Sequence, residues 1–288
     1  MTIESTLTSD GIRLHGILLE PDERRDDLNI DVIMMVHGSN GNFYASASNP
    51  RAEALRREGV PVALFNTRGH DVMAGSGQSG GHKVGNAFEL LSETHLDIAA
   101  VTDWMAGRGY ERICILGSSL GAVRVILAQA KNQDPRVASI ISCGPLRFSH
   151  KYYLESSMAD LHRQYFAEAT ALVAAGKPDQ IMSVEFPNEG AHFSAATYLD
   201  RHCSEHYDIT VAHTDAITCP VLVITGTEEK HPRVLDCGRD MAVLVGDKNP
   251  GYVWAHIEGG DHGLHTMDDV FHSTVLSFIT AKSAVASG

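Results

Sequence analysis

The sequence of 288 residues predicts an α/β fold with a mostly parallel, doubly wound sheet of eight strands and an inserted helical segment. Three observations lead to this prediction. Continuous apolar runs recur along the chain, and such runs are typical of strands that are buried on both faces of a parallel sheet. Segments with apolar residues three or four positions apart lie between the runs, which indicates helices that alternate with strands. One long stretch breaks this alternation and therefore predicts an insertion.

The first two strands are expected to form an antiparallel hairpin. Residues 12–19 alternate apolar and polar side chains after the turn pair Asp10-Gly11, and residues 2–8 supply the partner strand. The other six strands are expected at apolar runs, which are residues 30–36, 60–65, 113–116, 137–142, 221–225 and 252–257.

Helical patterns connect these strands. One begins near Ala87, after a glycine-rich loop at residues 74–85, and continues through apolar positions at helical spacing: Leu91, Ile98, Val101 and Met105. A second follows the fifth strand at residues 122–130, and the last covers residues 271–278. Such helices would cover the two faces of a doubly wound sheet.

Residues 145–215 interrupt the alternation. Four apolar residues at helical spacing mark an amphipathic helix in this stretch: Met158, Leu161, Tyr165 and Leu172. Gly176 and Pro178 follow in the order that ends a helix. We therefore expect a core formed by residues 1–144 and 216–288, with residues 145–215 inserted as a helical lid. The alternative is a set of extra helices that pack on the core without contacting a substrate.

Composition limits the class of partner. The formal net charge is −13, which argues against nucleic acid and anionic membranes because these partners bind basic patches. No apolar run approaches the roughly 20 residues that span a bilayer, and the N-terminal residues lack the pattern of a signal peptide. The five cysteines show no CxxC spacing, so buried thiols and a cytoplasmic location are expected.

The most specific motif is Gly117-Ser118-Ser119-Leu120-Gly121, a G-x-S-x-G sequence between an apolar run and a helical pattern. In this context the motif predicts a sharp strand-to-helix turn that lifts the hydroxyl of Ser119 above the sheet edge. The two glycines suit a turn that leaves no room for larger side chains. The alternative role for Ser119 is a helix N-cap, and Ser118 is its nearest rival as a nucleophile.

Four polar patches follow the ends of predicted parallel strands. They are the serine turn and residues 36–42, 226–229 and 259–263. The carboxyl ends of parallel strands meet at one edge of an open α/β sheet, where such sheets build their sites. The patches bring a serine, acidic residues and a histidine to that edge, which favours nucleophilic catalysis.

The strand pattern, the serine turn and the chain order of nucleophile, acid and histidine resemble the α/β-hydrolase superfamily over nearly the whole chain. The resemblance implies an α/β-hydrolase fold in which Ser119 is the nucleophile, Glu229 the acid and His262 the base. The family often places the acid three residues after a glycine such as Gly226, which selects Glu229 over Glu228. The family more commonly has aspartate there, so this sequence departs from the usual pattern.

Other residues have supporting roles in this interpretation. The oxyanion needs backbone donors, and the N–H of Leu120 is expected to supply one because the first N–H groups of a helix are free. The second donor is expected from Ser39, in the loop that His37 holds through hydrogen bonds. Arg68 is expected to be an ion-pair anchor. Further alternatives are Asp236 and Asp240 for the acid, and His256 and His265 for the base.

No metal or cofactor is expected. His202 and His206 are four residues apart, but the glutamate of a zinc-protease motif is missing, and an exposed helix face is the expected location. The glycine-rich residues 74–85 match no nucleotide-binding pattern.

The sequence therefore predicts a serine hydrolase that cleaves a carboxylic ester or related acyl bond of a small molecule. Lactonases, thioesterases, amidases and carbon–carbon bond hydrolases use the same residues and remain alternatives, because the fold does not select a substrate. A noncatalytic ligand-binding protein is a further alternative. A homodimer through the insertion or an edge strand is compatible with the sequence.

Overall fold

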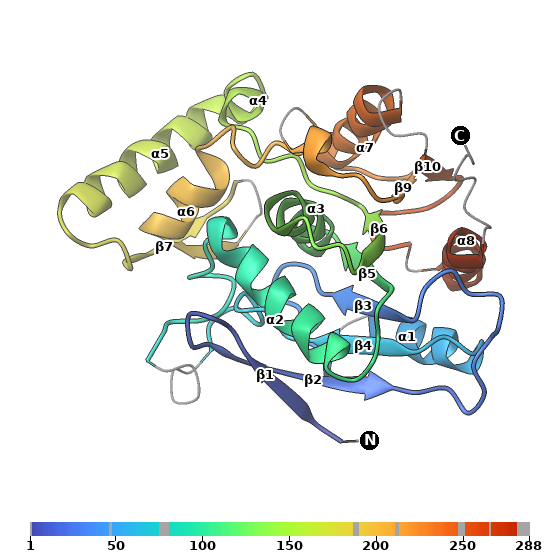
Figure 1. Cartoon of the computed structure of the whole chain (residues 1–288). Coiled ribbons are helices and arrows are strands. Elements are labelled where there is room, and N and C mark those ends of the chain that lie inside the picture. Colours follow the sequence, from blue (N-terminus) through green and yellow to red (C-terminus); the bar gives the residue numbers. More distant parts are fainter. Residues whose placement is uncertain are drawn as a thin grey trace.

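The computed structural model describes residues 2–45, 48–74, 81–186, 190–210, 213–246, 251–264 and 266–280. The strands of its main sheet are β1 (Glu4–Leu7), β2 (Arg13–Leu19), β3 (Val32–Val36), β4 (Val62–Phe65), β5 (Ile113–Ser118), β6 (Val137–Cys143), β9 (Val221–Gly226) and β10 (Tyr252–Ile257). The eight strands lie in the order β1-β2-β4-β3-β5-β6-β9-β10 (Figure 1). β2 is antiparallel to β1 and β4, and all other neighbours are parallel. This confirms the predicted fold class.

Each strand that the sequence predicts is present, but β10 differs in burial. Strands β3, β4 and β9 are buried along their whole length. β10 lies at the edge of the sheet, where Val253 is 47% and Trp254 is 37% exposed. The expectation of burial on both faces is therefore wrong for β10, because an edge strand has a neighbour on one side only.

Helices cover both faces of the sheet (Figure 1). They are α1 (Ser48–Arg57) and α8 (Asp268–Thr280) on one face, and α2 (Thr94–Ala106), α3 (Leu120–Asn132) and α7 (Pro232–Gly246) on the other. The helix expected near Ala87 begins later, with a 3₁₀ turn at Leu91–Glu93. The reason is tertiary: the backbone N–H of Ala87 bonds to the carbonyl of Val72, and the side chain of Glu89 enters a buried ion network.

Successive residues of a parallel strand enter two separate apolar cores, one on each side of the sheet. In β3, Val32, Met34 and Val36 pack in the core that contains residues of α2 and α3. Ile33 and Met35 pack in the core that contains residues of α1 and α8. The apolar runs in the sequence are continuous because both sets of side chains are buried.

Residues 145–215 lie between β6 and β9. They contain α4 (His150–Leu154), α5 (Ala159–Ala174), β7 (Ile181–Val184), β8 (Ala191–Ser194) and α6 (Ala195–His202). β7 and β8 form a separate antiparallel sheet that the sequence analysis did not predict, since each strand has only four residues. In Figure 1, α4, α5 and α6 stand together at one side of the main sheet. Tyr165, Phe193 and Tyr198 belong to an apolar cluster within this insertion.

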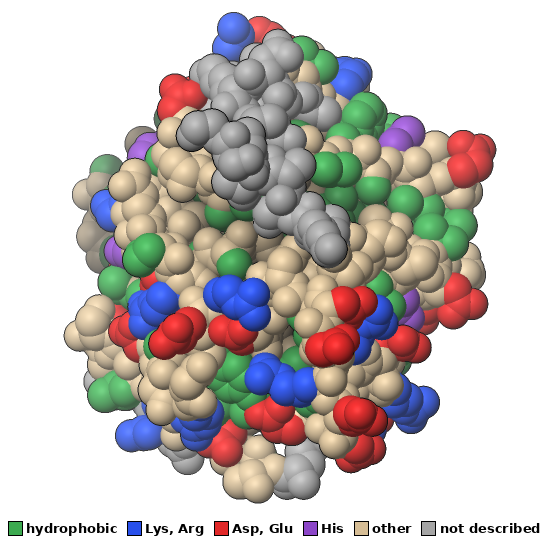
Figure 2. Space-filling model, turned by 45° about the vertical axis from the view of Figure 1, so that its right-hand side comes forward, with side chains coloured by type: hydrophobic (Ala, Val, Ile, Leu, Met, Phe, Trp, Pro, Cys, Tyr) green, Lys and Arg blue, Asp and Glu red, His purple; other side chains and the backbone are tan. Residues whose placement is uncertain are grey.

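The surface carries charges of both signs. Figure 2 shows Lys and Arg side chains beside Asp and Glu over the lower part of one face, and hydrophobic side chains towards its upper right. The excess of acidic residues is therefore not gathered into a single patch on this face. Among the described residues, no helix combines the length and apolar character needed to cross a bilayer. All five cysteines lie among the described residues, and each is a thiol and not half of a disulfide.

Three buried histidines should make the folded state sensitive to acid. Burial lowers the pKa of His37 to about 3 and of His162 to about 4, and it lowers the pKa of His202 well below its usual value. The unfolded chain binds protons at these sites below about pH 6.5, whereas the folded chain binds them only at lower pH. Their contribution to stability is therefore complete above about pH 6.5 and is lost as the pH falls.

We expect the free energy of unfolding to fall by up to about 1.4 kcal/mol per pH unit for each of these histidines in mild acid. The variant His202→Phe keeps a ring among the aromatic neighbours of this site. It should reduce the change in unfolding free energy per pH unit by the contribution of one histidine. Urea unfolding at several pH values measures the slope. His206→Phe, at an exposed histidine, provides the control for the exchange of histidine for phenylalanine. Equal slopes for His202→Phe and the parent protein would contradict the expectation.

Candidate active site

Ser119 lies at the turn between β5 and α3. Its φ of +56° is uncommon for a residue other than glycine and marks local backbone strain. The flanking glycines are required by close approach, because a Cβ on Gly117 would overlap the carbonyl of Gly121, and one on Gly121 would overlap the carbonyl of Val36. The Ser119 side chain makes no capping bond to α3, so a helix cap does not describe its role.

His262 lies between Ser119 and Glu229. Its Nε2 is 3.0 Å from the Oγ of Ser119, and its Nδ1 is 2.6 Å from Oε2 of Glu229. Burial alone would raise the pKa of the Glu229 carboxyl, but hydrogen bonds from His262 and from the backbone N–H of His231 outweigh burial and lower it. A charged carboxylate at this position favours the tautomer of His262 that has its proton on Nδ1.

The fold explains why residues so far apart in sequence meet. β9 and β10 are parallel neighbours, so the loops that carry Glu229 and His262 begin side by side. β6 lies between β9 and β5 and is followed by Gly144, where a Cβ would lie 3.4 Å from the His262 ring. His262 therefore extends across the end of β6 towards Ser119.

The alternative acids lie elsewhere. Glu228 is exposed, whereas the neighbouring Glu229 is buried. Asp236 accepts a hydrogen bond from the Tyr152 hydroxyl at 2.9 Å, and Asp240 pairs with Arg147 at 2.9 Å. These contacts orient both aspartates towards partners other than His262.

The structure also places the alternative base His256 and the alternative nucleophile Ser118. His256 is exposed on β10 and lies 3.0 Å from the hydroxyl of Thr225. Ser118 is the last residue of β5 and lies in register with Cys143 of β6. His265 and residues 75–80 of the glycine-rich loop lie outside the described residues.

The loop after β3 approaches the serine turn. A Cβ on Gly38 would lie 3.1 Å from the Cβ of Ser119, so this part of the loop lies against the serine. Ser39 is the next residue, and Leu120 is the first residue of α3, where N–H groups have no acceptor in a preceding turn. β3 and β5 are neighbours at the point where the strand order reverses, and open α/β sheets bind ligands there.

His37 holds the loop after β3 through hydrogen bonds, which is the structural role expected for it. Its Nδ1 is 2.8 Å from the carbonyl of Gly38, and its Nε2 accepts a hydrogen bond from the backbone N–H of Thr67 at 3.1 Å. Burial and the nearby Arg124 lower the pKa of His37 to about 3. The ring is therefore neutral, so Nδ1–H can donate to Gly38 while Nε2 accepts.

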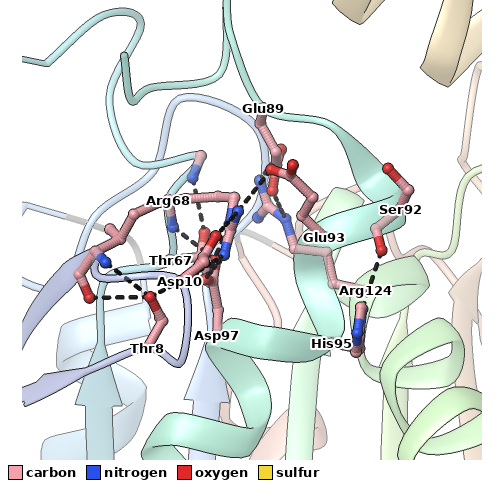
Figure 3. Close-up of polar contacts among 12 residues, drawn as sticks. Thr8, Asp10, Thr67, Arg68, Glu89, Ser92, Glu93, His95, Asp97 and Arg124 are labelled. Carbon is pink, nitrogen blue, oxygen red and sulfur yellow. Dashed lines mark hydrogen bonds and ion pairs between the residues drawn. The ribbon is translucent and has the colours of Figure 1, made fainter. Parts of the chain in front are cut away.

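A buried ion network supports the same loop, and the sequence analysis missed it. Arg124 of α3 donates to the His37 carbonyl at 2.7 Å and pairs with Glu89 at 2.6 Å. Arg201 of α6 pairs with Glu89 at 2.9 Å, which joins the insertion to the core. The two arginines lie 35 and 112 positions from Glu89, and no local pattern marks a pairing over such distances. Figure 3 shows Glu89 facing Arg124.

Arg68 is the ion-pair anchor that the sequence predicts. Its guanidinium lies 3.0 Å from Asp10, 2.6 Å from Glu93 and 2.9 Å from Asp97 (Figure 3). Arg68 itself is buried, and these contacts connect the loop after β4 with α2 and with the hairpin at the N-terminus.

A cavity of about 310 Å³ lies between the insertion and the core. Tyr152, Met158 and Phe186 line it from the insertion, and His231 and Arg233 line it from the core. Most of this lining is apolar or aromatic. The ring centroid of His231 is 6.5 Å from that of His262, so the cavity adjoins the Ser119 site through this histidine.

The histidine pair considered for a metal does not form a site. α6 ends at His202, so His202 and His206 do not share a helix. His202 is buried among aromatic rings, which corrects the expected exposed face, and His206 is exposed. A different group could hold an ion: single ligand atoms of His150, His162 and Cys203 lie within 4.8 Å of one another.

The sheet topology and the arrangement at Ser119 define an α/β hydrolase. The chain belongs to the Hydrolase_4 family, described as serine aminopeptidase, S33, whose model matches residues 29–234. No relative was found among curated proteins by sequence.

Solved structures show the same fold. The chain is similar to the α/β hydrolase GrgF from Penicillium sp. sh18, with 16% identity, 96% of this chain and 97% of that chain covered, and a TM-score of 0.70. A monoacylglycerol lipase from Paleococcus ferrophilus is 18% identical, with 93% of this chain and 98% of that chain covered and a TM-score of 0.64. The esterase Pf2001 from Pyrococcus furiosus is 18% identical, with 96% of this chain and 88% of that chain covered and a TM-score of 0.63.

Proposed function

We propose that this protein is a serine hydrolase that cleaves carboxylic esters of small molecules through an acyl-enzyme on Ser119. One observation carries the proposal: the His262 ring lies within hydrogen-bond distance of both the Ser119 hydroxyl and the Glu229 carboxylate. A serine hydroxyl is a weak nucleophile unless an adjacent base removes its proton. Membership of a serine hydrolase family supports the same assignment.

In the proposed reaction, the Oγ of Ser119 attacks the ester carbonyl while Nε2 of His262 takes the hydroxyl proton. The tetrahedral intermediate collapses, the alcohol leaves with that proton, and the acyl group stays on Ser119. Water then attacks the acyl-enzyme, and His262 again accepts and returns one proton. Glu229 stabilises the imidazolium and fixes its tautomer throughout.

The backbone N–H groups of Leu120 and Ser39 would bind the oxyanion of the tetrahedral intermediate. Leu120 directly follows the nucleophile at the start of α3, and Ser39 follows Gly38, which lies against Ser119. Each such donor typically lowers the barrier by about 3–4 kcal/mol. His37 and Arg124 would position the loop that carries the Ser39 donor.

We propose that residues 145–215 act as a lid that forms part of the substrate pocket. The apolar cavity between this insertion and His231 would accept an apolar acyl or alcohol group. Two solved structures of similar fold are an esterase and a monoacylglycerol lipase, which favours an ester as the first substrate to test.

Aminoacyl amides are the second substrate class, because the family description names an aminopeptidase. An aminopeptidase needs an anionic group for the substrate's ammonium. Glu185 lines the cavity and could supply such a carboxylate, and its Oε2 also accepts a hydrogen bond from the backbone N–H of Gly190 at 3.0 Å. Ester and aminoacyl p-nitroanilide hydrolysis should be measured side by side, and we expect the ester to be cleaved faster.

The proposal is tested by the intact mass of the protein after incubation with a reactive fluorophosphonate. We expect one adduct on the parent protein and none on Ser119→Ala, because only an activated serine reacts with this probe. An unlabelled parent protein that is folded by circular dichroism would contradict the proposal. Equal labelling of both proteins would place the nucleophile at another residue.

Exchange of the acid should separate Glu229 from its neighbour. The variant Glu229→Gln loses the charge that faces Nδ1 of His262, and we expect ester turnover to fall by about 10³–10⁴-fold. Glu228→Gln changes an exposed neighbour in the same turn and should alter turnover by less than about twofold. The kcat of each variant with a p-nitrophenyl ester measures the difference. The opposite ranking would assign the acid to Glu228.

A further inference from the structure

Three side chains of the kind that bind transition metals converge within the insertion. His150 is the first residue of α4, His162 lies in α5, and Cys203 immediately follows α6. One ligand atom of each lies within 4.8 Å of the others. Cys203 is 53 positions from His150, so the folding of the insertion creates this cluster.

One ring nitrogen of His150 faces one ring nitrogen of His162. Nδ1 of His150 lies 2.9 Å from Nε2 of His162. The other ring nitrogen of His162 lies 3.1 Å from the hydroxyl of Tyr198. Metal-binding histidines commonly have such a partner on the second nitrogen, because it fixes the ring and its tautomer. When Nδ1–H of His162 donates to Tyr198, its Nε2 holds a lone pair that accepts from Nδ1–H of His150, and an ion would replace that proton once His150 carries its proton on Nε2.

The surroundings of the cluster are largely apolar. His162 is fully buried, and its ring packs 5.2 Å from the ring of Tyr153 and 5.8 Å from that of Phe186. The ring of Phe166 lies 5.1 Å from that of His150. An apolar shell of this kind controls the access of water to a metal site and the local dielectric.

The spacing of the two imidazole nitrogens is close to that of a zinc site. Two imidazole nitrogens that bind Zn²⁺ tetrahedrally at about 2.0–2.1 Å lie roughly 3.3 Å apart. The nitrogens of His150 and His162 are 2.9 Å apart, so they need to separate by only ~0.4 Å. His150 lies partly exposed on the five-residue helix α4, where a shift of this size needs no repacking of a core.

We propose that His150, His162 and Cys203 bind a divalent transition-metal ion, with Zn²⁺ as the preferred ion. Two imidazoles and one thiolate are ligands that Zn²⁺ favours, and a water molecule would complete four-coordination. The Cys203 thiol loses its proton to solvent when it binds the ion.

The ion would join three helices of the insertion at one point. Tyr153 and Phe186, which pack against His162, also line the cavity described above. A bound ion would therefore stabilise one wall of that cavity. This inference does not rest on the proposed hydrolase activity, because the binding of the ion can be measured without a substrate.

The test is the zinc content and zinc affinity of the full chain, purified without an affinity tag. After equilibration with Zn²⁺ and removal of excess ion, we expect one zinc per chain by inductively coupled plasma mass spectrometry. His150→Ala and Cys203→Ser should each weaken zinc binding by at least about 100-fold in competition with a chelator. His206→Ala removes an exposed histidine of the same insertion and should leave binding unchanged.

Cobalt substitution keeps the proposal testable even when a variant folds poorly. The parent protein with Co²⁺ should show a thiolate-to-cobalt absorption band, and Cys203→Ser should lack it. A parent protein that binds cobalt without this band would overturn the proposed ligand set. Equal zinc content in the parent protein, His150→Ala and Cys203→Ser would overturn the site as a whole.

Discussion

Replacing Ser119 with alanine is expected to lower ester turnover by a factor on the order of 10⁶, because nucleophile, base and acid act as a unit. The Oγ atom that this change removes is the atom that lies 3.0 Å from Nε2 of His262. Alanine is small enough for the turn, which already holds a non-glycine residue at φ +56°. The folded state should therefore persist while the reaction stops. The kcat with a p-nitrophenyl ester measures the effect.

The matched control is the neighbouring serine. Ser118 is the last residue of β5, and Ser118→Ala should change turnover by no more than a few-fold. Circular dichroism and thermal unfolding show whether both variants are folded. Near-parental turnover in Ser119→Ala would refute the proposed mechanism. A large loss in Ser118→Ala would indicate that the site depends on the whole turn.

Much of the candidate site could be predicted because its parts are local. The turn at Ser119 is encoded within five residues, and both glycines of the motif are explained by close backbone contacts. Glu229 and His262 each follow an apolar run, and the carboxyl ends of parallel strands meet at one sheet edge. The structure therefore brings together three residues that are distant in sequence but similarly placed relative to their strands.

The features that the sequence analysis missed depend on tertiary contacts. Glu89 belongs to a segment that was expected to be helical, yet its side chain pairs with arginines from α3 and α6. β10 has the composition of a buried strand, but its place at the sheet edge exposes Val253 and Trp254. The cluster of His150, His162 and Cys203 has no fixed spacing that a motif could describe.

The second large effect is expected from Glu89→Gln. Glu89 is fully buried and pairs with two arginines that are also buried, Arg124 and Arg201. Burial alone would raise the pKa of Glu89, but the two guanidinium groups outweigh it and keep the pKa below its usual value. The glutamine variant has no charge to balance these groups, and breaking a buried pair in this way typically costs about 3–5 kcal/mol. Urea unfolding should show a loss of this size.

Glu93→Gln is the control for Glu89→Gln, because it removes an ion pair that water can reach and not a buried one. Glu93 lies 2.6 Å from Arg68, but its side chain is 43% exposed, and pairs that water can reach contribute about 0–1 kcal/mol. Because Arg124 also donates to the His37 carbonyl, Glu89→Gln should disturb the loop beside Ser119 and lower kcat as well. Similar unfolding free energies for the two variants would mean that the buried network does not stabilise the fold. If Glu89→Gln is destabilised but keeps its kcat, the buried network stabilises the fold without positioning the loop beside Ser119.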